Sequence, residues 1–518
     1  GAWMSIETPT EHELTALAVS ERLGIAEHEV PVYTGAAAGL LGSWSVVEGL
    51  HAESESARPA ATRSSSRPVD ADNPLNAWYV TTDIGPTASG PLDGLTVAVK
   101  DNIAVAGVPM MNGSAMLDGY TPSRDATVVS RLLEAGAAVI GKAVCEDLCF
   151  SGGSHTARGG PVRNPWALDR SSGGSSAGSA ALVAAGEVDL AHGGDQGGSI
   201  RIPASFCGVV GHKPTFGLVP YTGAFPIESS IDHVGPITRS VSDAALMLGV
   251  LAGPDGLDPR QGADVARPDY LGALRFGARG LRVGVLSEGF GRAESEPQVD
   301  ETVRAAVAAL AGAGVEADEV SIPWHLHGSA IWDVISVEGA TGQMIDGNGY
   351  GMNYKGLYDP EQIDFYGRRW REDPSQFSET VKLVLMAGRY ALTRHHGKHY
   401  AMAQNLVPRL TAAYDEQLSR FDVLVLPTTP MRSTVLPAAG APLEEQLGRA
   451  LEMLGNTAPF NVTGHPACSV PAGVVDGLPV GLMVVGKHHD DATVLRVAHA
   501  VEQAVGTFPA PHREGVIA

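Results

Sequence analysis

Cysteine is scarce in this sequence, which has only four cysteines among 518 residues: Cys145, Cys149, Cys207 and Cys468. Four cysteines in so long a chain do not form the dense disulfide framework of small secreted domains. Cys145 and Cys149 would share one face of a helix, but no second pair completes a zinc site. The sequence therefore predicts buried free thiols in a reducing, cytoplasmic compartment.

Basic residues and long apolar runs are scarce as well. Lysine and arginine number 36 against 58 aspartates and glutamates, a formal net charge of −22. Direct nucleic-acid binding relies on Lys and Arg that displace counterions from phosphates, so this balance argues against it. No apolar run reaches the ~18 residues of a membrane helix, and residues 34–47 are apolar but short and rich in glycine. The chain does not open with the basic and hydrophobic regions of a signal peptide. We therefore expect neither a nucleic-acid partner nor a membrane.

Glycine, by contrast, is abundant, with 63 residues. It gathers with serine in two segments, SSGGSSAGS at 171–179 and GGDQGGSIR at 193–201. Between them the pattern predicts a helix of small residues at 180–185 and a strand at 188–191. Because glycine has no Cβ, such loops let backbone N–H groups and serine hydroxyls come close to a small ligand.

The remaining sequence predicts a helical extension followed by an α/β body. Residues 8–50 read as helical, with a capping box at Thr10 and Glu13, and residues 52–75 read as a linker. A strand at 95–99, a helix around 128–133 and a strand at 138–141 form a βαβ unit, which favours a parallel or mixed sheet covered by helices. The pattern returns at 281–322, and a last strand is expected at 422–426. Residues 325–415 read as a mostly helical insertion that could roof a pocket.

Four interpretations of the glycine and serine segments compete. A phosphate-binding loop would need a lysine that is absent, and a dinucleotide site would need a G-x-G-x-x-G motif after a strand. A flexible linker disagrees with the helix and strand between the segments. The fourth is nucleophilic catalysis by serine. There, residues 174–178 match the G-x-S-x-G nucleophile elbow, but the elbow must follow a strand directly and residues 164–170 do not read as one.

Several motifs together resemble the amidase signature family. They are VAVKDN at 97–102, GGSSAGSA at 173–180, GGSIR at 197–201, GHKPTFG at 211–217 and FNVTGHPA at 460–467. The resemblance covers about residues 75–505. Within the family, the helical extension and the sequence DQGG at 195–198 resemble bacterial amidases associated with nitrile degradation. It implies an α/β fold whose mixed, twisted central sheet is covered by helices on both faces. The expected domains are a helical extension and linker at 1–74 and a catalytic domain at 75–518.

The resemblance implies a Ser–Ser–Lys mechanism. Ser199 would be the nucleophile that forms an acyl-enzyme. Ser175, preceded by a cis peptide bond in the family, would relay the proton of Ser199 to Lys100 and later protonate the leaving amine. Lys100 can accept a proton only where burial keeps it neutral. Asp101 beside it would favour the charged form unless its side chain points elsewhere.

The same resemblance implies an oxyanion hole formed by backbone N–H groups of Gln196, Gly197, Gly198 and Ser199. Other family members commonly have threonine where Gln196 stands, so contacts there can differ. For Ser176, Ser179 and Arg201 we expect helix capping and a structural ion pair. Phe150, Gln196, Ile231 and Trp332 are the expected substrate-binding residues, and an apolar, partly aromatic wall suits neutral substrates.

The expected function is hydrolysis of a neutral aliphatic or aromatic carboxamide to a carboxylic acid and ammonia. An aryl amide, carbamate or ester hydrolase of the same family is one alternative, and an amidotransferase subunit that acts only with partner proteins is another. No cofactor is expected. No metal is expected either, because His395 and His399 lack a third ligand and His488 with His489 indicates a surface turn. A small-molecule amide is the expected partner, and we also expect a homodimer.

Overall fold

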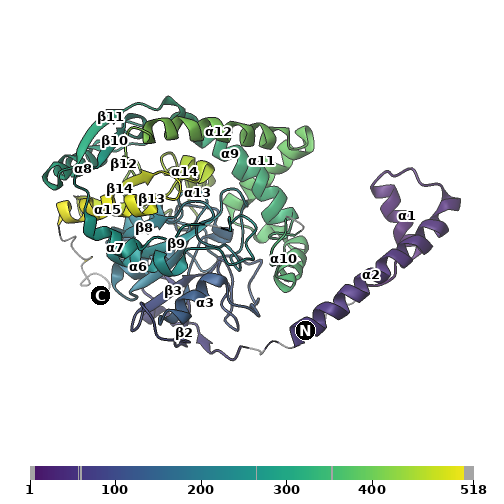
Figure 1. The fold of residues 1–518 in the computed structure, drawn as a ribbon. Coiled ribbons are helices and arrows are strands. Elements are labelled where there is room, and N and C mark those ends of the chain that lie inside the picture. The colour runs from purple at the N-terminus through teal and green to yellow at the C-terminus, as the bar shows by residue number, and fades with distance from the viewer. Residues whose placement is uncertain are drawn as a thin grey trace. The chain divides into compact units, whose positions relative to one another are not determined.

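The chain divides into two compact units, residues 1–61 and residues 62–518. The computed structural model describes residues 6–56, 58, 61–263, 265–351, 354–506 and 511. Figure 1 shows the first unit as helices alone and the second as a large sheet with helices around it. Residues 62–74, which the sequence analysis placed in the linker, belong to the second unit.

The first unit contains α1 (Glu11–Ser20) and α2 (Val30–Ser56). The predicted capping box opens α1: the Thr10 hydroxyl accepts the Glu13 N–H at 3.2 Å, and the Glu13 carboxylate accepts the Thr10 N–H at 2.7 Å. Two donors that a helix start leaves without partners are thereby satisfied.

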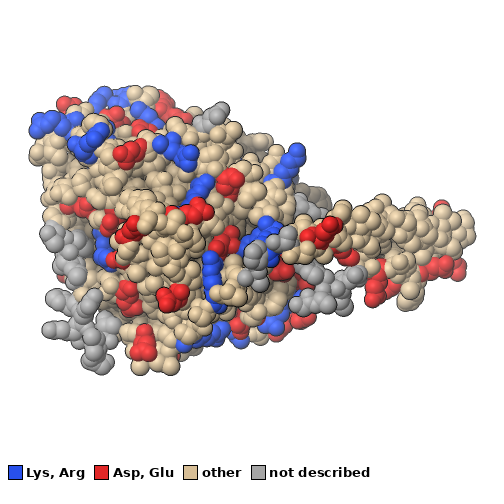
Figure 2. All heavy atoms as spheres, turned by 60° about the horizontal axis from the view of Figure 1, so that its bottom comes forward, with Lys and Arg blue, Asp and Glu red and all other residues tan. Residues whose placement is uncertain are grey.

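The α2 segment departs from the sequence-based expectation. Its apolar stretch was expected to be too short for a membrane, yet the helical segment Glu27–Ser56 is long and apolar enough to cross one by length and composition alone. Helix formation through the glycines joins short apolar runs into one continuous element. Large apolar side chains on α2, including Leu40, Trp44 and Val47, are exposed, and the first unit accordingly looks mostly tan in Figure 2. On the second unit the same figure shows acidic and basic side chains interspersed.

Among the residues that the structure describes, twelve strands form the mixed sheet of the second unit. β3 runs parallel to β4 and β7, and β10 runs parallel to β11 and β12, whereas the other neighbours are antiparallel. In sheet order the strands are β1 (Ser65–Ser66), β2 (Trp78–Ile84), β4 (Ala138–Ala143), β3 (Thr96–Lys100), β7 (Leu190–Asp195), β9 (His233–Thr238), β8 (Val210–Lys213), β13 (Ala467–Val475), β14 (Leu478–Gly486), β12 (Val423–Pro427), β10 (Arg282–Leu286) and β11 (Glu316–Val320).

Both faces of the sheet are buried, as predicted. Successive side chains of a strand point to opposite faces, so Val97 and Val99 join one apolar core while Ala98 joins another. The first core also contains residues of α3 (Thr127–Glu134), α6 (Val241–Leu251), α7 (Tyr270–Ala273), α8 (Pro297–Ala309) and α15 (Asp491–Val505). On the other face lie α4 (Ala177–Ala185), α5 (Arg201–Cys207), α9 (Gly328–Ala340), α12 (Lys398–Leu418) and α14 (Ala458–Thr463). Figure 1 labels α3, α6, α7, α8 and α15 of the first group and α9, α12 and α14 of the second.

The segment at 325–415 is mostly helical, as predicted. Besides α9 and most of α12 it contains α10 (Pro360–Glu372) and α11 (Glu379–His395), and α13 (Leu443–Leu451) follows β12. Residues 167–171 were not expected to form a strand, but they form β6 (Ala167–Ser171), paired with β5 (Arg163–Asn164). Because this pair is separate from the main sheet, β6 does not supply the strand that a nucleophile elbow requires.

Candidate active site

Three segments distant in sequence bring Lys100, Ser175 and Ser199 to one edge of the sheet. Lys100 is the last residue of β3, Ser175 lies just before α4, and Ser199 lies in the turn after β7. β7 pairs in parallel with β3, so the carboxyl ends of both strands meet at the edge where α/β sheets bind ligands. α4 packs against both strands, which places its first turn at that edge.

Lys100 is completely buried. Its side-chain nitrogen Nζ lies 2.8 Å from Ser175 Oγ and 3.3 Å from the carbonyl oxygen of Gly194. Asp101 does point elsewhere: its carboxylate pairs with Lys142 at 2.9 Å and accepts two backbone N–H groups. Lys100 therefore has a serine hydroxyl and a neutral carbonyl as its hydrogen-bond partners, without a paired carboxylate among the described residues.

The serines around Ser175 join α4 to β7. The peptide bond between Gly174 and Ser175 is cis. Ser176 was expected to cap α4, but its hydroxyl instead donates to the Gly194 carbonyl at 3.1 Å and accepts the Gly194 N–H at 3.2 Å. Ser179, also expected to cap, donates to the His192 carbonyl at 2.9 Å. These bonds hold the start of α4 against the end of β7.

The turn that carries Ser199 presents free backbone donors. Gly198 has φ +141°, and a Cβ there would collide with the Thr457 hydroxyl, so the turn requires glycine. Thr457 in turn donates to the Gly197 carbonyl at 2.6 Å. Among the described residues, no hydrogen bond uses the N–H groups of Gln196, Gly197, Gly198 or Ser199. Such consecutive N–H groups can stabilise an oxyanion.

A narrow pocket opens at Ser199. Three of the expected substrate-binding residues line it: Phe150, Gln196 and Trp332. Trp332 Nε1 donates to the Gln196 carbonyl at 2.6 Å, and its ring lies 6.1 Å from that of Phe150. The fourth, Ile231, is fully buried in the core and does not line this pocket. The remaining lining residues are Cys149, Ser151, Gly152, Gly197, Ile227, Leu451 and Leu454.

Sequence reasoning missed Ile227, Leu451 and Leu454 because nothing in their local pattern separates a pocket wall from ordinary core. Ile227 and Ile231 are four residues apart in one irregular segment, and only its path decides which of them reaches the pocket. Leu451 and Leu454 come from α13 and the turn after it, outside the motifs.

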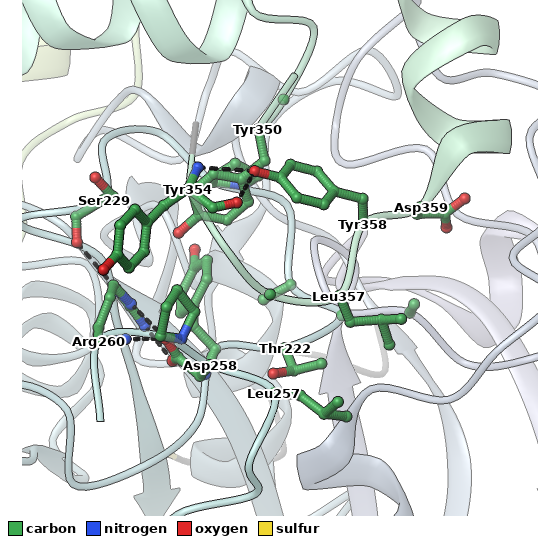
Figure 3. Close-up of a pocket in the computed structure, with 18 of the residues that line it drawn as sticks. Thr222, Ser229, Leu257, Asp258, Arg260, Tyr350, Tyr354, Leu357, Tyr358 and Asp359 are labelled. Carbon is green, nitrogen blue, oxygen red and sulfur yellow. Dashed lines mark hydrogen bonds and ion pairs between the residues drawn. The ribbon is translucent and has the colours of Figure 1, made fainter. Parts of the chain in front are cut away.

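A larger pocket adjoins the first at Tyr221, which lines the larger pocket and contacts Gln196 of the smaller one. Figure 3 shows Tyr350, Tyr354 and Tyr358 in its wall, with Arg260 beside Asp258. Its volume, open solvent included, is about 1280 Å³. No local motif joins these tyrosines in the sequence, so sequence analysis did not find this pocket.

Comparison with a family model identifies the family of this chain. The family model described as Amidase matches residues 76–495. The chain belongs to the amidase family. As an amidase it is a hydrolase that acts on amide C–N bonds.

Individual relatives support the same assignment. An enantioselective amidase from Rhodococcus rhodochrous is 54% identical over 453 residues, which are 87% of each chain. A glutamyl-tRNA(Gln) amidotransferase subunit from Exiguobacterium sibiricum is 41% identical over 83% of this chain and 88% of its own. The solved structure of peptide amidase from Stenotrophomonas maltophilia has a TM-score of 0.68 and 31% identity, and the match covers 82% of this chain and 85% of that one.

In this amidase Arg201 forms the expected structural ion pair. Its guanidinium binds the Asp195 carboxylate at 2.9 and 3.0 Å, and both side chains are completely buried. The same carboxylate accepts the N–H of Ile200 at 3.1 Å and the side-chain amide of Asn461 at 2.7 Å. Burial alone would raise the pKa of Asp195, but Arg201, with smaller contributions from Lys213 and Asn461, keeps the pKa well below its usual range. Asp195 and Arg201 thus lie at the two ends of the Ser199 turn, and the Asp195 carboxylate is ionised at neutral pH.

One group of potential metal ligands occurs among the described residues of the amidase. Asp415, His465 and His488 have ligand atoms within 4.8 Å of one another. His488, expected in a surface turn, is half-buried, and its Nε2 donates to the Thr463 carbonyl at 2.7 Å. His465 Nε2 already pairs with Asp415 at 3.0 Å. The group lies outside the Ser199 pocket.

Lys213 makes a testable contribution to the pH dependence of stability. Burial lowers its pKa to about 7, and Arg201 acts in the same direction, whereas a lysine in the unfolded chain titrates near ~10.4. Between these values the unfolded state binds more protons, so the contribution of Lys213 to stability rises with pH. From pH 7 to 9 we expect wild type to gain about 2 kcal/mol relative to Lys213→Met. Urea unfolding of both proteins at several pH values measures this difference in the free energy of unfolding. A difference that does not change with pH would contradict the lowered pKa of Lys213.

Proposed function

We propose that this amidase hydrolyses neutral aliphatic or aromatic carboxamides to the carboxylic acid and ammonia through an acyl-enzyme on Ser199. The observation that carries the proposal is the buried contact of 2.8 Å between Lys100 Nζ and Ser175 Oγ, at the sheet edge where the Ser199 pocket opens. A lysine without a carboxylate partner, in contact with a hydroxyl, is suited to receive a proton through that hydroxyl.

In the proposed reaction, Ser199 Oγ attacks the amide carbonyl while its proton passes through Ser175 to Lys100. The resulting oxyanion is stabilised by backbone N–H groups of the turn at 196–199. The C–N bond then breaks as the proton returns through Ser175 to the leaving nitrogen, and ammonia departs. Water attacks the ester carbonyl of the acyl-enzyme, releasing the acid and restoring the Ser199 hydroxyl.

The walls of the pocket support a neutral substrate. No Asp, Glu, Lys, Arg or His is among the described residues that line it, so a charged acyl group would lose hydration without a partner of opposite charge. The pocket is also narrow, which suits a small amide. The same machinery can attack an aryl amide, carbamate or ester, and these remain alternative substrates of the site.

Ammonia release from benzamide and propionamide by the purified chain alone tests the proposal. We expect release with both amides, because the three proposed catalytic residues belong to one chain. The similarity to an amidotransferase subunit makes the partner-dependent alternative concrete: release only after addition of partner proteins would favour that alternative. A panel of amides, carbamates and esters with the same acyl group then ranks the leaving groups.

We further propose a cytoplasmic homodimer that binds neither nucleic acid nor membrane. Free, buried thiols at all four cysteines support a reducing compartment, and the exposed apolar side chains of α2 offer a surface that a second copy would cover. Sedimentation velocity of the full chain, with and without neutral lipid vesicles, tests this. A monomer, or co-sedimentation with vesicles, would contradict it.

A further inference from the structure

Tyr221 is held rigidly between the two pockets. Its backbone N–H donates to the Asp258 carboxylate at 2.8 Å. The same carboxylate binds the Arg260 guanidinium through two hydrogen bonds at 3.0 and 2.8 Å, as Figure 3 shows. The guanidinium lies over the Tyr221 ring, 5.0 Å from its centroid. Asp258 and Arg260, which line the larger pocket, therefore hold the backbone and the ring of Tyr221 in place, and with them the position of its hydroxyl.

That hydroxyl determines the orientation of the Gln196 side chain. Tyr221 Oη lies 3.0 Å from the Phe225 carbonyl oxygen and 2.8 Å from Gln196 Nε2. Burial raises the pKa of Tyr221 well above its usual value, so the phenol keeps its single proton. The carbonyl can only accept, so the phenol donates to it and accepts from the Gln196 NH2 group. The side-chain amide of Gln196 is thereby held with its nitrogen toward Tyr221.

The opposite end of the Gln196 amide lacks a partner. Oε1 is buried, and no described residue donates a hydrogen bond to it. Gln196 is itself 2% exposed and lines the pocket that contains Ser199. Buried acceptors in proteins are nearly always paired, so an unpaired acceptor on a residue that lines a ligand pocket points to a donor on the ligand.

We propose that Tyr221 is a positioning residue that holds Gln196 Oε1 ready to accept the N–H of the scissile amide. This inference rests on the proposed function, because it requires attack by Ser199 in this pocket. It narrows the substrate class to amides with at least one N–H, that is, primary and N-monosubstituted carboxamides. Esters and N,N-disubstituted amides leave Oε1 unpaired. Sites built to pair with a polar group on the substrate reject analogues lacking it by factors up to about 10⁴.

A substrate series on wild-type enzyme tests the class without any mutation. Benzamide, N-methylbenzamide, N,N-dimethylbenzamide and methyl benzoate all give the same benzoyl-enzyme. We expect kcat/KM for N-methylbenzamide to stay within about 30-fold of benzamide, and that for the dimethyl amide to fall at least about 10³-fold. Comparable turnover of the dimethyl and monomethyl amides would overturn the inference.

The positioning role is tested by Tyr221→Phe. Without the hydroxyl, the Gln196 amide is free to turn its NH2 group toward the substrate, so kcat/KM for benzamide should fall about 10- to 100-fold. Methyl benzoate has no N–H, so its kcat/KM should change by less than about threefold. A merely structural role would lower both values together. Tyr354→Phe is the matched control, because Tyr354 lines the larger pocket without a hydrogen bond to Gln196, and it should leave both values unchanged.

Gln196→Met provides a second variant in case Tyr221→Phe fails to fold. It keeps the length of the side chain but removes the acceptor, and the same selective loss of amide turnover is expected. If the ratio of kcat/KM for benzamide to kcat/KM for methyl benzoate is unchanged in the folded variants, the inference is overturned but the proposed function is not. Failure of wild type to form a benzoyl-enzyme from either benzamide or methyl benzoate, followed by mass spectrometry, would instead remove the proposed function on which it rests.

Discussion

Replacing Ser199 by alanine is expected to lower amide hydrolysis by about 10⁴-fold or more. The substitution removes the protein atom that attacks the carbonyl carbon in the proposed mechanism, so no acyl-enzyme can form. It leaves the backbone donors at 196–199 and the buried Asp195–Arg201 pair in place. We therefore expect the Ser199→Ala variant to keep the fold.

Two measurements follow the loss of the nucleophile. Ammonia release gives the rate, and intact-protein mass spectrometry of a quenched reaction shows whether the acyl mass is added. Ser205→Ala is the matched control: Ser205 is also buried, on α5 close to the same turn, but its hydroxyl contacts Thr429 at 2.9 Å. We expect this control to retain activity. A Ser199→Ala enzyme with more than a few per cent of wild-type turnover would assign the nucleophile to another residue.

Lys100→Met is expected to lower turnover by about 10³-fold or more. Methionine fills nearly the same volume but cannot take the proton that leaves Ser199 through Ser175. The effect should fall on kcat rather than KM, because Lys100 is buried behind Ser175 and is absent from the lining of the pocket.

Lys100→Arg distinguishes a base from a fixed positive charge. A guanidinium keeps the charge but stays protonated at all accessible pH values. We therefore expect the arginine variant to be as inactive as the methionine variant, provided circular dichroism shows that both fold. Steady-state kinetics that recovered a tenth or more of wild-type activity with arginine would show that charge, and not proton transfer, is what the site needs at position 100.

The sequence allowed much of this site to be predicted, and particular residues show why. Lys100 follows a short, mostly apolar run at 95–99 that is rich in β-branched residues, so its place at the carboxyl end of a strand follows from local pattern. Ser175 and Ser199 lie in glycine-rich motifs. Because glycine has no Cβ, residue type alone indicates that the backbone of these motifs can come close to a ligand. The capping box at Thr10 and Glu13 likewise involves residues three apart.

Other features depend on contacts that no local pattern encodes. Serine is common at helix caps, and Ser176 and Ser179 lie near the start of α4. Their hydroxyls nevertheless donate hydrogen bonds to backbone carbonyls of β7, because α4 packs directly on that strand. Ile227 rather than Ile231 reaches the pocket because the segment between β8 and β9 is irregular and has no period to extrapolate. The Asp101 carboxylate does not pair with Lys100 because it pairs with Lys142 on the neighbouring strand β4.

The sequence by itself determined part of the main sheet, including β3, β4, β7 and β12, and the chemical identity of the proposed reactive groups. Periodicity, glycine content and residue type act over a few neighbouring positions. Only the tertiary structure decided which of those groups meet. The order of β3 and β7 brings Ser175 to Lys100 across 75 residues, and the Arg260–Asp258 pair fixes Tyr221 against Gln196. Hydrogen bonds and ion pairs of this kind depend on distances in space, which the packing of the whole sheet and its helices sets.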